Sequence, residues 1–527
     1  MCYRQMISAN LCVRPTARYC ILWEARFLQY LVMCGIACGI SFQAQGESKQ
    51  VSAAIHIDAL GISDENLSIS ETVQLAVQAR LSVAVITPHD NARVSYGLPP
   101  LRNVIRFGVE RESITSFGSE NYLEAVRTTN LNEPEVLTLA GVEAVPAYFW
   151  QGSPLKRLTA RNLHKHMLVV GLTNSEDFDS VPSLANGFPG RLEGAFLLNL
   201  WPIGVLVLGC VLVLFNRRVS TADAPRSKLP GILVMVIGLL FGFNAYPFYQ
   251  PFDAYNGDQG IGPYQAVIDH ANARGALTYW AHPEVHQYSS MPAPWPASIL
   301  VDSVYFETEP YSGDLLTAEG YTGFAIFEEG AISIGRPGGI WDQTLLEYCS
   351  GIREHPVWAI GELDFDMGHI DHGIGTSQTV LWLNEVTESG VVDALRRGSC
   401  YARRGMGTDI TINDFMISGD QTGFTSGQNG QISGTPMVTI DIDTAPASMP
   451  LTVQIVRNGA SIHTIEVEEP GQLTFRDTGP GLKGAFFYRF MIFKGGWPIV
   501  ASNPIFVTID PDPVSVIGNP KQIEASL

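Results

Sequence analysis

The stretch Ala54-Ile-His-Ile-Asp58 closes a short apolar run with an imidazole and a carboxylate. Asp64 follows in a polar segment, and Ile86-Thr-Pro-His-Asp90 closes the next apolar run in the same way. Polar side chains at successive strand ends are typical of the loops at the carboxyl face of a barrel of parallel strands. These stretches therefore predict a barrel whose strand ends carry a site.

Four later segments extend this pattern. Each places a His, Glu or Asp at the boundary of an apolar run. The segments are Ala140-Gly-Val-Glu143, His166-Met-Leu-Val-Val-Gly-Leu172, Tyr279-Trp-Ala-His-Pro-Glu284 and Ala359-Ile-Gly-Glu-Leu-Asp-Phe-Asp366. A single histidine near a strand end carries little information, so the inference rests on the joint order of the series.

This ordered series resembles the PHP family (polymerase and histidinol phosphatase) of metal-dependent phosphoesterases. Members of that family open with His-x-His and an Asp six residues later. They continue with Thr-Asp-His-Asp, Gly-x-Glu, two separate histidines and a closing Asp-x-His. Carried over residue by residue, the resemblance covers residues 52–405 apart from a central insertion and predicts nine metal ligands: His56, Asp58, Asp64, His89, Glu143, His166, His282, Asp364 and Asp366.

The resemblance also implies an α/β fold with a distorted (β/α)7 barrel that holds two or three divalent metal ions, with Mn, Fe or Zn as candidates. The residues expected to take part in catalysis are Glu143, which would bridge two metals, His282 and Asp364. The implied ligand sets are His56, Asp58 and Asp364 for one metal, His166 and His282 for the second, and Asp64, His89 and Asp366 for the third. Clustered cations of this kind activate water and hold phosphate oxygens for in-line attack.

The sequence departs from the family pattern at three positions. Asp58 and Asp366 stand where the family has histidines, and Pro88 stands where it has an Asp. Added carboxylates shift the metal preference from Zn²⁺ toward Mn²⁺, Fe²⁺ or Mg²⁺. Decay of a catalytic site is the alternative interpretation. His369 and His372 follow closely and are alternative sources of the missing imidazole, although we favour Asp366.

Residues 50–192 and 251–408 alternate short apolar runs with helix-like stretches. Leu81 to Thr87 is predicted as a buried strand after a helix capped near Ser70. Pro263 to Gly275 is predicted as a helix that begins with Pro and ends with Gly. Such alternation is typical of α/β folds. We therefore expect these two segments to form the two halves of one barrel.

Residues 193–250 lie between the halves and contain two uncharged apolar runs, Ala195 to Phe215 and Leu229 to Tyr249. Each run is long enough to cross a bilayer, so together they predict a transmembrane hairpin rather than buried core helices. The connecting loop, residues 216–228, holds four basic residues and one Asp. The positive-inside rule places such a loop in the cytoplasm and both barrel halves on the opposite side.

Residues 1–46 contain a further apolar run, Phe27 to Phe42, that follows several arginines. This pattern predicts a signal peptide or an uncleaved signal anchor. Combined with the hairpin, it predicts a protein of the bacterial inner membrane whose globular domains lie in the periplasm or outside the cell, with the lipid bilayer as one partner.

The pattern changes after residue 408. Short β-rich runs such as Met437–Asp443, Leu451–Val456 and Pro504–Ile509 are separated by Gly, Pro and Asn. They predict a small β-sandwich over residues 409–512, followed by a tail at residues 513–527.

The composition limits the function further. Hydrophobic residues make up 46% of the chain and charged residues 16%, with a net charge of -19. This charge argues against nucleic acid as a partner through bulk electrostatics. The expected function is hydrolysis of a phosphate ester, of unidentified structure, by metal-activated water at an extracytoplasmic site. The alternatives are a non-catalytic binding or scaffold domain with a degenerate site, and a hydrolase for amides or other esters.

Overall fold

The computed structural model describes residues 49–61, 67–189, 195–218, 227–295, 297–299, 301–327, 333–366, 373–404 and 410–509. The chain divides into two units, Met1–Ser48 and Lys49–Leu527, and all of the described residues belong to the second. Several predictions fall outside the described residues: the signal segment 1–46, Asp64, His369, His372, the tail 513–527 and most of the loop 216–228.

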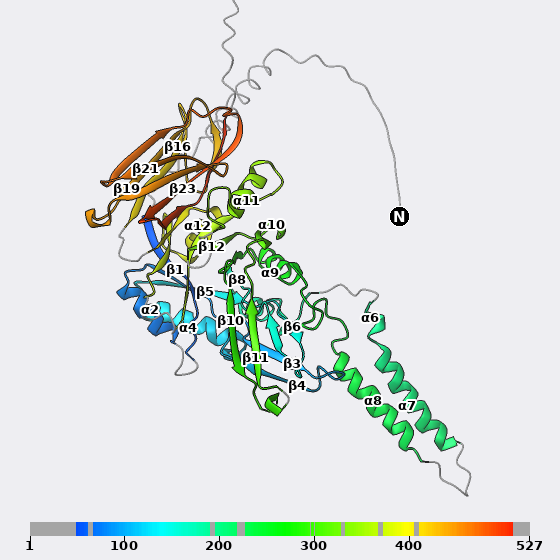
Figure 1. The fold of residues 1–527 in the computed structure, drawn as a ribbon. Coiled ribbons are helices and arrows are strands. Elements are labelled where there is room, and N and C mark those ends of the chain that lie inside the picture. The colour runs from blue at the N-terminus through cyan, green and yellow to red at the C-terminus, as the bar shows by residue number, and fades with distance from the viewer. Residues whose placement is uncertain are drawn as a thin grey trace, which may run out of the picture. The chain divides into compact units, whose positions relative to one another are not determined.

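Seven strands close into a barrel in the order β1-β2-β5-β8-β9-β12-β13, with β13 paired to β1. Several of them are labelled in Figure 1. Their bounds are β1 (Lys49–Ile57), β2 (Val83–Ile86), β5 (Leu137–Ala144), β8 (Met167–Val170), β9 (Leu277–Trp280), β12 (Gly323–Phe327) and β13 (Trp358–Phe365). Neighbouring strands run parallel except at β8, which is antiparallel to both β5 and β9.

The barrel strands are short apolar runs that are buried on both faces. Every residue of β2 and β8 is buried. Alternate residues of β2 enter different core clusters, with Ala84 and Ile86 in one and Val83 and Val85 in the other. This is the period of two that a strand imposes. Because both faces are covered, the sequence shows a continuous apolar run without alternation.

Apart from the apolar helices within residues 201–245, the described residues form five helices of ten residues or more. They are α2 (Ile69–Gln78), α4 (Ser119–Asn132), α9 (Gly262–Ala273), α11 (Ile340–Cys349) and α12 (Glu388–Arg397). Helix α2 begins with a complete capping box between Ser68 and Glu71. Shorter helices are α3 (Ile114–Phe117), α5 (Ser175–Asp179), α10 (Asp314–Thr317) and the 3₁₀ helix η1 (Ala297–Ile299).

The predicted α/β class with a (β/α)7 barrel is wrong. Strands account for 36% of the structure and helices for 26%, and the barrel is a closed seven-stranded β-barrel of mixed direction. Between β5 and β8 the chain forms strands β6 (Phe149–Gly152) and β7 (Leu158–Arg161) in place of a helix, so β8 enters the barrel reversed. A buried run of four apolar residues carries no signal for strand direction, and the sequence pattern therefore missed this reversal.

Additional hairpins lie in the connections between the barrel strands. Strands β3 (Arg93–Gly97) and β4 (Arg106–Glu110) form an antiparallel ribbon. Strands β10 (Gln287–Pro292) and β11 (Ser303–Thr308) join β7 and β6 in a four-stranded sheet. The ribbon and this sheet share one apolar cluster. These hairpins raise the strand content of a region that the sequence pattern assigned to alternating helices and strands.

Strand β14 (Ser377–Leu383) pairs with β1 and extends the barrel sheet through β15 (Cys400–Arg404) into the C-terminal region. The other elements there are β16 (Thr411–Ser418), β17 (Gly423–Thr425), β18 (Asn429–Ile432), β19 (Met437–Asp443), η3 (Pro446–Ser448), β20 (Leu451–Arg457), β21 (Ala460–Val467), β22 (Gly471–Arg476), β23 (Gly484–Lys494), β24 (Trp497–Ser502) and β25 (Ile505–Ile509). A second sheet, β17-β16-β19-β22, shares a core with the first: the rings of Phe415 and Phe490 lie 4.8 Å apart.

The predicted transmembrane hairpin also needs correction. Among the described residues, the stretch Phe196–Phe215 is the one helical candidate long and apolar enough to cross a membrane. It runs from within α6 (Ala195–Leu198) through most of α7 (Trp201–Arg218). Helix α8 (Leu229–Ala245) has only 17 residues. The expected second span stops short because Pro247 follows, and proline is incompatible with continued helix.

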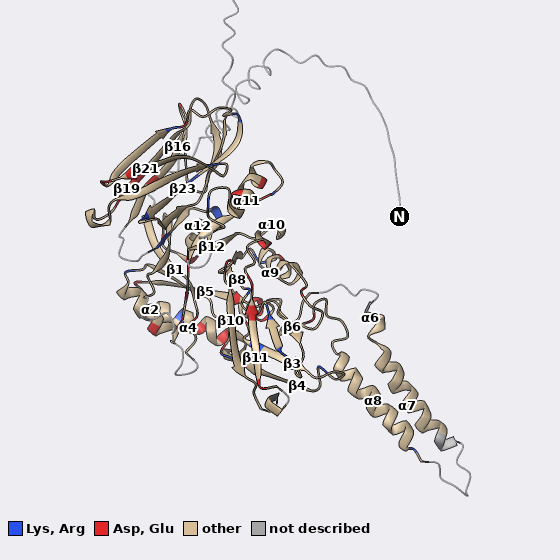
Figure 2. Ribbon diagram, viewed as in Figure 1, with Lys and Arg blue, Asp and Glu red and all other residues tan. Residues whose placement is uncertain are grey.

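Helices α7 and α8 run antiparallel, side by side (Figure 1). A Cβ added at Gly209 would meet Met235, and one added at Gly238 would meet Leu206, so glycines allow the two backbones to approach closely. Figure 2 shows both helices without charged residues along their central parts. The outward side chains, among them Val207, Leu214 and Leu233, are exposed apolar groups.

Candidate metal centre

The candidate site residues gather at one end of the barrel. His56, Glu143 and Asp364 lie toward the carboxyl ends of β1, β5 and β13, and His282 follows β9 shortly after its end. His166 immediately precedes β8. Because β8 runs antiparallel to its neighbours, its first residues lie at the end where the other strands finish. The reversed strand thus brings a residue that precedes a strand into a group of residues that end strands.

Glu143 lies at the centre of this group and is buried. Its Oε1 atom lies 2.5 Å from His166 Nδ1, 3.1 Å from His56 Nε2 and 3.3 Å from His282 Nε2. Its Oε2 atom lies 2.7 Å from Nδ1 of His89, which follows β2. A single buried carboxylate therefore faces four imidazoles.

Two of these imidazoles use their other ring nitrogen to donate a hydrogen bond away from Glu143. His56 Nδ1 donates to the carboxylate of Glu362. His166 Nε2 lies 2.8 Å from the carbonyl oxygen of Leu163, which can only accept, so this nitrogen carries the proton. When each ring is neutral, the nitrogen that faces Glu143 therefore carries no proton and presents its lone pair to the carboxylate.

His282 follows the same rule through a tyrosine. The Tyr311 hydroxyl donates its proton to the carbonyl of Ala281, and its oxygen lies 3.1 Å from His282 Nδ1. The tyrosine has one proton to give, so His282 Nδ1 must be the donor in the second contact. His282 Nε2 is again left as the atom directed at the carboxylate.

This arrangement fits a divalent cation. His56 Nε2 and His89 Nδ1 are buried and lack a hydrogen-bond partner, although each lies close to a Glu143 oxygen, because the contact geometry is not that of a hydrogen bond. A lone pair against a carboxylate is repulsive unless a proton or a cation lies between them. Imidazole nitrogens and carboxylate oxygens together suit Zn, Mn or Fe.

Three groups of side chains have ligand atoms within 4.8 Å of one another. The groups are His89, Glu143 and His166; His56, Glu143 and Asp364; and His164, His282 and Asp364. Six of the nine ligands predicted from the sequence belong to them. Glu143 and Asp364 each belong to two groups. These two carboxylates are therefore placed to bridge neighbouring cations.

The electrostatics of the metal-free site follow from its crowding. Burial alone would raise the pKa of Glu143, but the imidazoles of His166, His56 and His89 outweigh burial and hold it well below its usual value. Burial lowers the pKa of His89, yet Glu143, Asp58 and other carboxylates raise it to about 9. The pKa of His282 is raised in the same way against burial. In the metal-free protein, protons on these imidazoles therefore supply part of the positive charge that a cation would supply.

Three of the site residues hold unusual backbone conformations. His56, His282 and Asp364 have φ values of 71°, 27° and 48°. Positive φ is disfavoured for residues with a Cβ, and such strain clusters at functional sites where the surrounding structure holds it. All three lie where a barrel strand ends or has just ended. The strain turns these side chains to the barrel end.

His164 is a site residue that the sequence reasoning missed. Its ring stacks on His282 with the centroids 4.8 Å apart, and it shares a donor group with His282 and Asp364. Burial lowers its pKa, with further lowering from His166 and His282. The spacing His164-Lys-His166 was a signal available in the sequence, because residues two apart share one side of an extended segment.

Glu362 and Tyr311 were also missed. Besides accepting from His56, the Glu362 carboxylate accepts the backbone N–H of His282 at 3.0 Å. The alternation Glu362-Leu-Asp364 on β13 was the available signal, since it places two carboxylates on one side of a strand. Tyr311 follows β11 in a loop, and nothing in the sequence pattern distinguishes it from other tyrosines. Both residues act on the orientation of imidazoles rather than as donors to a cation.

The remaining predicted ligands stand apart. Asp58 is described but belongs to none of the three groups, and burial raises its pKa to about 6. Asp366 is also described and belongs to none of them. Asp64 lies outside the described residues. The metal-binding roles of these three carboxylates stay predictions.

The site opens to solvent at one edge. The side chains of His89 and Asp364 are 27% and 31% exposed, whereas those of His56, Glu143, His166 and His282 are at most 3% exposed. A substrate would therefore approach at the edge that His89 and Asp364 share, above a floor of buried imidazoles.

Comparison with known proteins adds no assignment: no protein-family model matches the chain, and a search of curated proteins finds no match.

Proposed function

We propose that this protein is a metal-dependent hydrolase that acts on a phosphate ester and is attached to a lipid bilayer. One observation carries the catalytic part of the proposal. Three buried imidazoles, those of His56, His166 and His282, each donate a hydrogen bond from one ring nitrogen and direct the other at the Glu143 carboxylate. Histidine ligands of protein-bound metals are oriented by such outer partners.

The three donor groups around Glu143 and Asp364 would hold the cations. A divalent cluster there would supply Lewis-acid stabilisation of phosphate oxygens and lower the pKa of the attacking water. The chain itself fixes the donors: Glu362 holds the His56 ring and Tyr311 holds the His282 ring in one tautomer. The buried floor excludes bulk water, and the edge at His89 and Asp364 admits the ester. The ordered motif series that resembles the PHP family supports phosphate esters over other substrates.

The test of this function is hydrolysis by the purified full chain with Mn²⁺, Fe²⁺ or Zn²⁺ added, over a panel of phosphate mono- and diesters. Glu143→Gln keeps the shape of the side chain and removes its charge. The proposal expects metal-dependent hydrolysis of at least one phosphate ester by the wild type and none by the variant. Hydrolysis of amide or carboxylic-ester substrates alone would overturn the phosphoesterase assignment. It would still support a metal-dependent hydrolase with a different substrate.

A non-catalytic binding or scaffold domain is the second candidate, and a specific observation favours it. Asp58 and Asp366, the two positions where aspartate replaces a family histidine, join none of the donor groups. A site with fewer ligands can hold one cation without supporting two-metal chemistry. One metal per chain together with no activity on the whole panel would support this candidate.

The membrane part of the proposal rests on α7 and α8. Both helices expose apolar side chains, and their central parts carry no charged residue (Figure 2), which is the pattern of a lipid-contacting element. We propose that this pair inserts into the bilayer and so attaches the barrel to its surface. The bacterial inner membrane, with the barrel on its outer side, remains the proposed location.

A further inference from the structure

Aromatic residues collect at one end of the α7–α8 pair. Trp201 begins α7 and is 50% exposed, and Tyr246 directly follows α8 and is 69% exposed. The ring of Trp201 lies 5.1 Å from that of Phe241, and the rings of Tyr246 and Phe248 lie 6.0 Å apart. Trp and Tyr concentrate at the boundary between lipid and water. This end of the pair therefore marks the level of the membrane surface, if the pair inserts as proposed.

The loop between β3 and β4 is hydrogen-bonded to the end of α8 near these aromatic residues. The backbone N–H of Asn103 donates to Asn244 Oδ1 at 2.9 Å, and Asn103 Nδ2 donates to the Asn244 carbonyl at 2.6 Å. Asn244 lies in the last turn of α8. Val104 and Ile105, which follow Asn103, are apolar and exposed. Two exposed apolar side chains are thus held beside the aromatic end of the helix pair.

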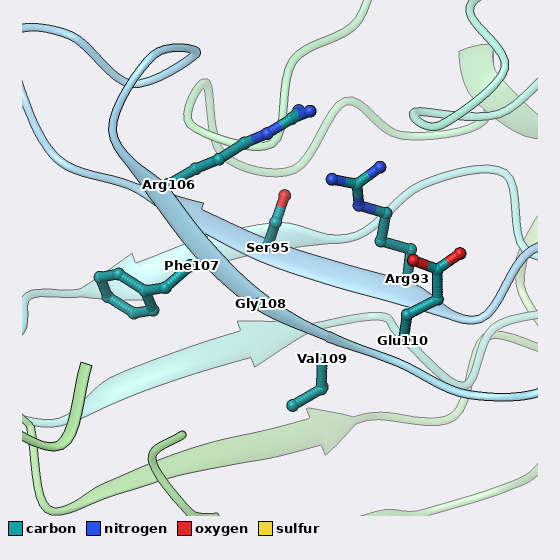
Figure 3. Close-up of a pocket in the computed structure, with 7 residues that line it drawn as sticks. All are labelled: Arg93, Ser95, Arg106, Phe107, Gly108, Val109 and Glu110. Carbon is teal, nitrogen blue, oxygen red and sulfur yellow. The ribbon is translucent and has the colours of Figure 1, made fainter. Parts of the chain in front are cut away.

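The β3–β4 ribbon has two unlike faces. Its inner face packs on the body of the protein through Tyr96 and Phe107. Its outer face forms a hollow of about 130 Å³ whose polar lining consists of Arg93, Ser95, Arg106 and Glu110 (Figure 3). Strand register accounts for the hollow, because Ser95 pairs with Gly108, which has no side chain to fill the space.

The charges of this face are ordered along the ribbon. Arg106 lies next to the loop, whereas Arg93 pairs in register with Glu110 at the opposite end. Neither arginine makes an ion pair or a side-chain hydrogen bond with any residue that the structure describes. Arg102, inside the loop, stacks on the Tyr255 ring at 4.0 Å, which holds its guanidinium in place. The cationic end of the ribbon is therefore the end that carries Val104 and Ile105.

We propose that the β3–β4 ribbon is a second membrane-contact surface that binds anionic phospholipid headgroups beside the helix pair. Val104 and Ile105 enter the interface, and Arg102 and Arg106, at the end of the ribbon away from Glu110, bind headgroup phosphates. Arginine suits this role because its planar fork pairs with two phosphate oxygens. The inference rests on the proposed attachment of α7 and α8 to a bilayer, and it would fix the orientation of the barrel above the membrane.

Quenching of an added tryptophan by brominated acyl chains tests this surface. The full chain is reconstituted in phosphatidylcholine vesicles with or without phosphatidylglycerol, and the fluorescence of the parent is subtracted. Three single variants are compared: Val104→Trp on the ribbon, Val207→Trp on α7, and Leu131→Trp as an exposed apolar control on α4. The proposal expects loss of the added signal for Val104→Trp and Val207→Trp, and no loss for Leu131→Trp.

The outcomes distinguish membrane attachment through α7 and α8 from membrane contact through the β3–β4 ribbon. Quenching at Val207→Trp without quenching at Val104→Trp overturns the ribbon surface and keeps the membrane attachment. Quenching at neither position overturns both. The double change Arg102→Glu and Arg106→Glu should reduce quenching of Val104→Trp in vesicles with phosphatidylglycerol, while quenching of Val207→Trp persists. Unchanged quenching in that background would overturn the headgroup assignment. Metal content of these variants should equal that of the wild type, which shows that the barrel is intact.

Discussion

The barrel end and the α7–α8 pair depart from the usual distribution of residues in opposite directions. The barrel end places four imidazoles, three of them buried, around a buried carboxylate, with ring nitrogens that lack hydrogen bonds. The helix pair exposes apolar side chains such as Leu214 and Phe215. In water alone, both arrangements are unfavourable, because buried polar groups need partners and apolar surface favours burial.

Each region requires a different surrounding to become favourable. A cation with two positive charges would satisfy lone pairs and carboxylates together, so the barrel end fits a metal. A hydrocarbon phase would satisfy side chains without polar groups, so the helix pair fits a lipid bilayer. The buried polar groups and the exposed apolar side chains are informative because each set lies in one part of the molecule rather than scattered over its surface.

The largest effect is expected from the centre of the barrel end. Mn²⁺ at about 1,000 times its Kd would stabilise the wild type by ~4 kcal/mol, because it binds the folded state alone. Glu143→Gln should remove this stabilisation, since the bridging charge is lost. Thermal unfolding with and without Mn²⁺ measures the effect. An equal rise of the Tm in both proteins would place the cation elsewhere.

The helix pair gives the next effect. Val207→Asp puts a charge in the middle of α7, which costs roughly 2.5–3.5 kcal/mol if that position lies in hydrocarbon. The matched change Leu131→Asp, on an exposed position of α4, should stay within about 0.5 kcal/mol. The share of each variant in washed membranes reports the difference. Equal membrane shares for both variants would mean that α7 is an ordinary surface helix.

Glu362→Gln tests the orientation of the imidazoles. The amide that replaces the carboxylate weakens the acceptor for His56 Nδ1, and changes to such outer partners lower metal affinity by roughly 10–100-fold. Tyr311→Phe removes the acceptor for His282 and should act in the same direction. Isothermal titration with Mn²⁺ gives both affinities. Unchanged affinity in both variants would show that these contacts serve packing only.

The pH dependence follows from the raised histidine pKa values. His89 has a pKa of about 9 in the metal-free protein, so at pH 7 it holds a proton that a metal must displace. Metal affinity should therefore rise between pH 6.5 and 9, by about tenfold per pH unit for each proton displaced. By the same sign, the stability that protonated His89 gives to the metal-free protein is complete below about pH 6.5 and is lost as the pH rises through 9. Titrations in buffers of different ionisation enthalpy count the protons released.

The smallest effect is expected from a change unrelated to either region. Ser68→Ala removes the side chain that accepts from the Glu71 backbone N–H in the capping box of α2. Loss of an N-cap costs about 1 kcal/mol. Urea unfolding should show this loss while metal affinity and membrane share stay at wild-type values. A fall in metal affinity would show that α2 supports the barrel end.

Much of the candidate site was predictable because its residues lie where apolar runs begin or end. His56, His89, Glu143, His166, His282 and Asp364 were all found in this way. His164 and Glu362 were readable from spacings of two residues. Tyr311 was not, because its contact depends on how a loop after β11 folds over His282. Asp58 and Asp366, which were predicted from the same boundaries but stand where the family has histidines, are the two described ligands outside the donor groups.

The fold was harder to predict than the site. Runs such as Met167–Val170 show that a segment is buried but carry no information on its direction. The β6–β7 segment reads as a connection, and its pairing with β11 depends on residues far along the chain. Local patterns therefore pointed to candidate site residues at strand ends, while the tertiary pairing decided the class of fold.

The proposed function depends on divalent cations that the barrel end would hold through Glu143. The most direct measurement is elemental analysis of the full chain, purified in detergent without chelator, for the wild type and Glu143→Gln. About two metal ions per wild-type chain are expected, as two-metal hydrolysis needs, and most of them should be lost in the variant. Wild-type protein that stays nearly metal-free after incubation with Mn²⁺, Fe²⁺ and Zn²⁺ would show that the barrel end is not a metal centre.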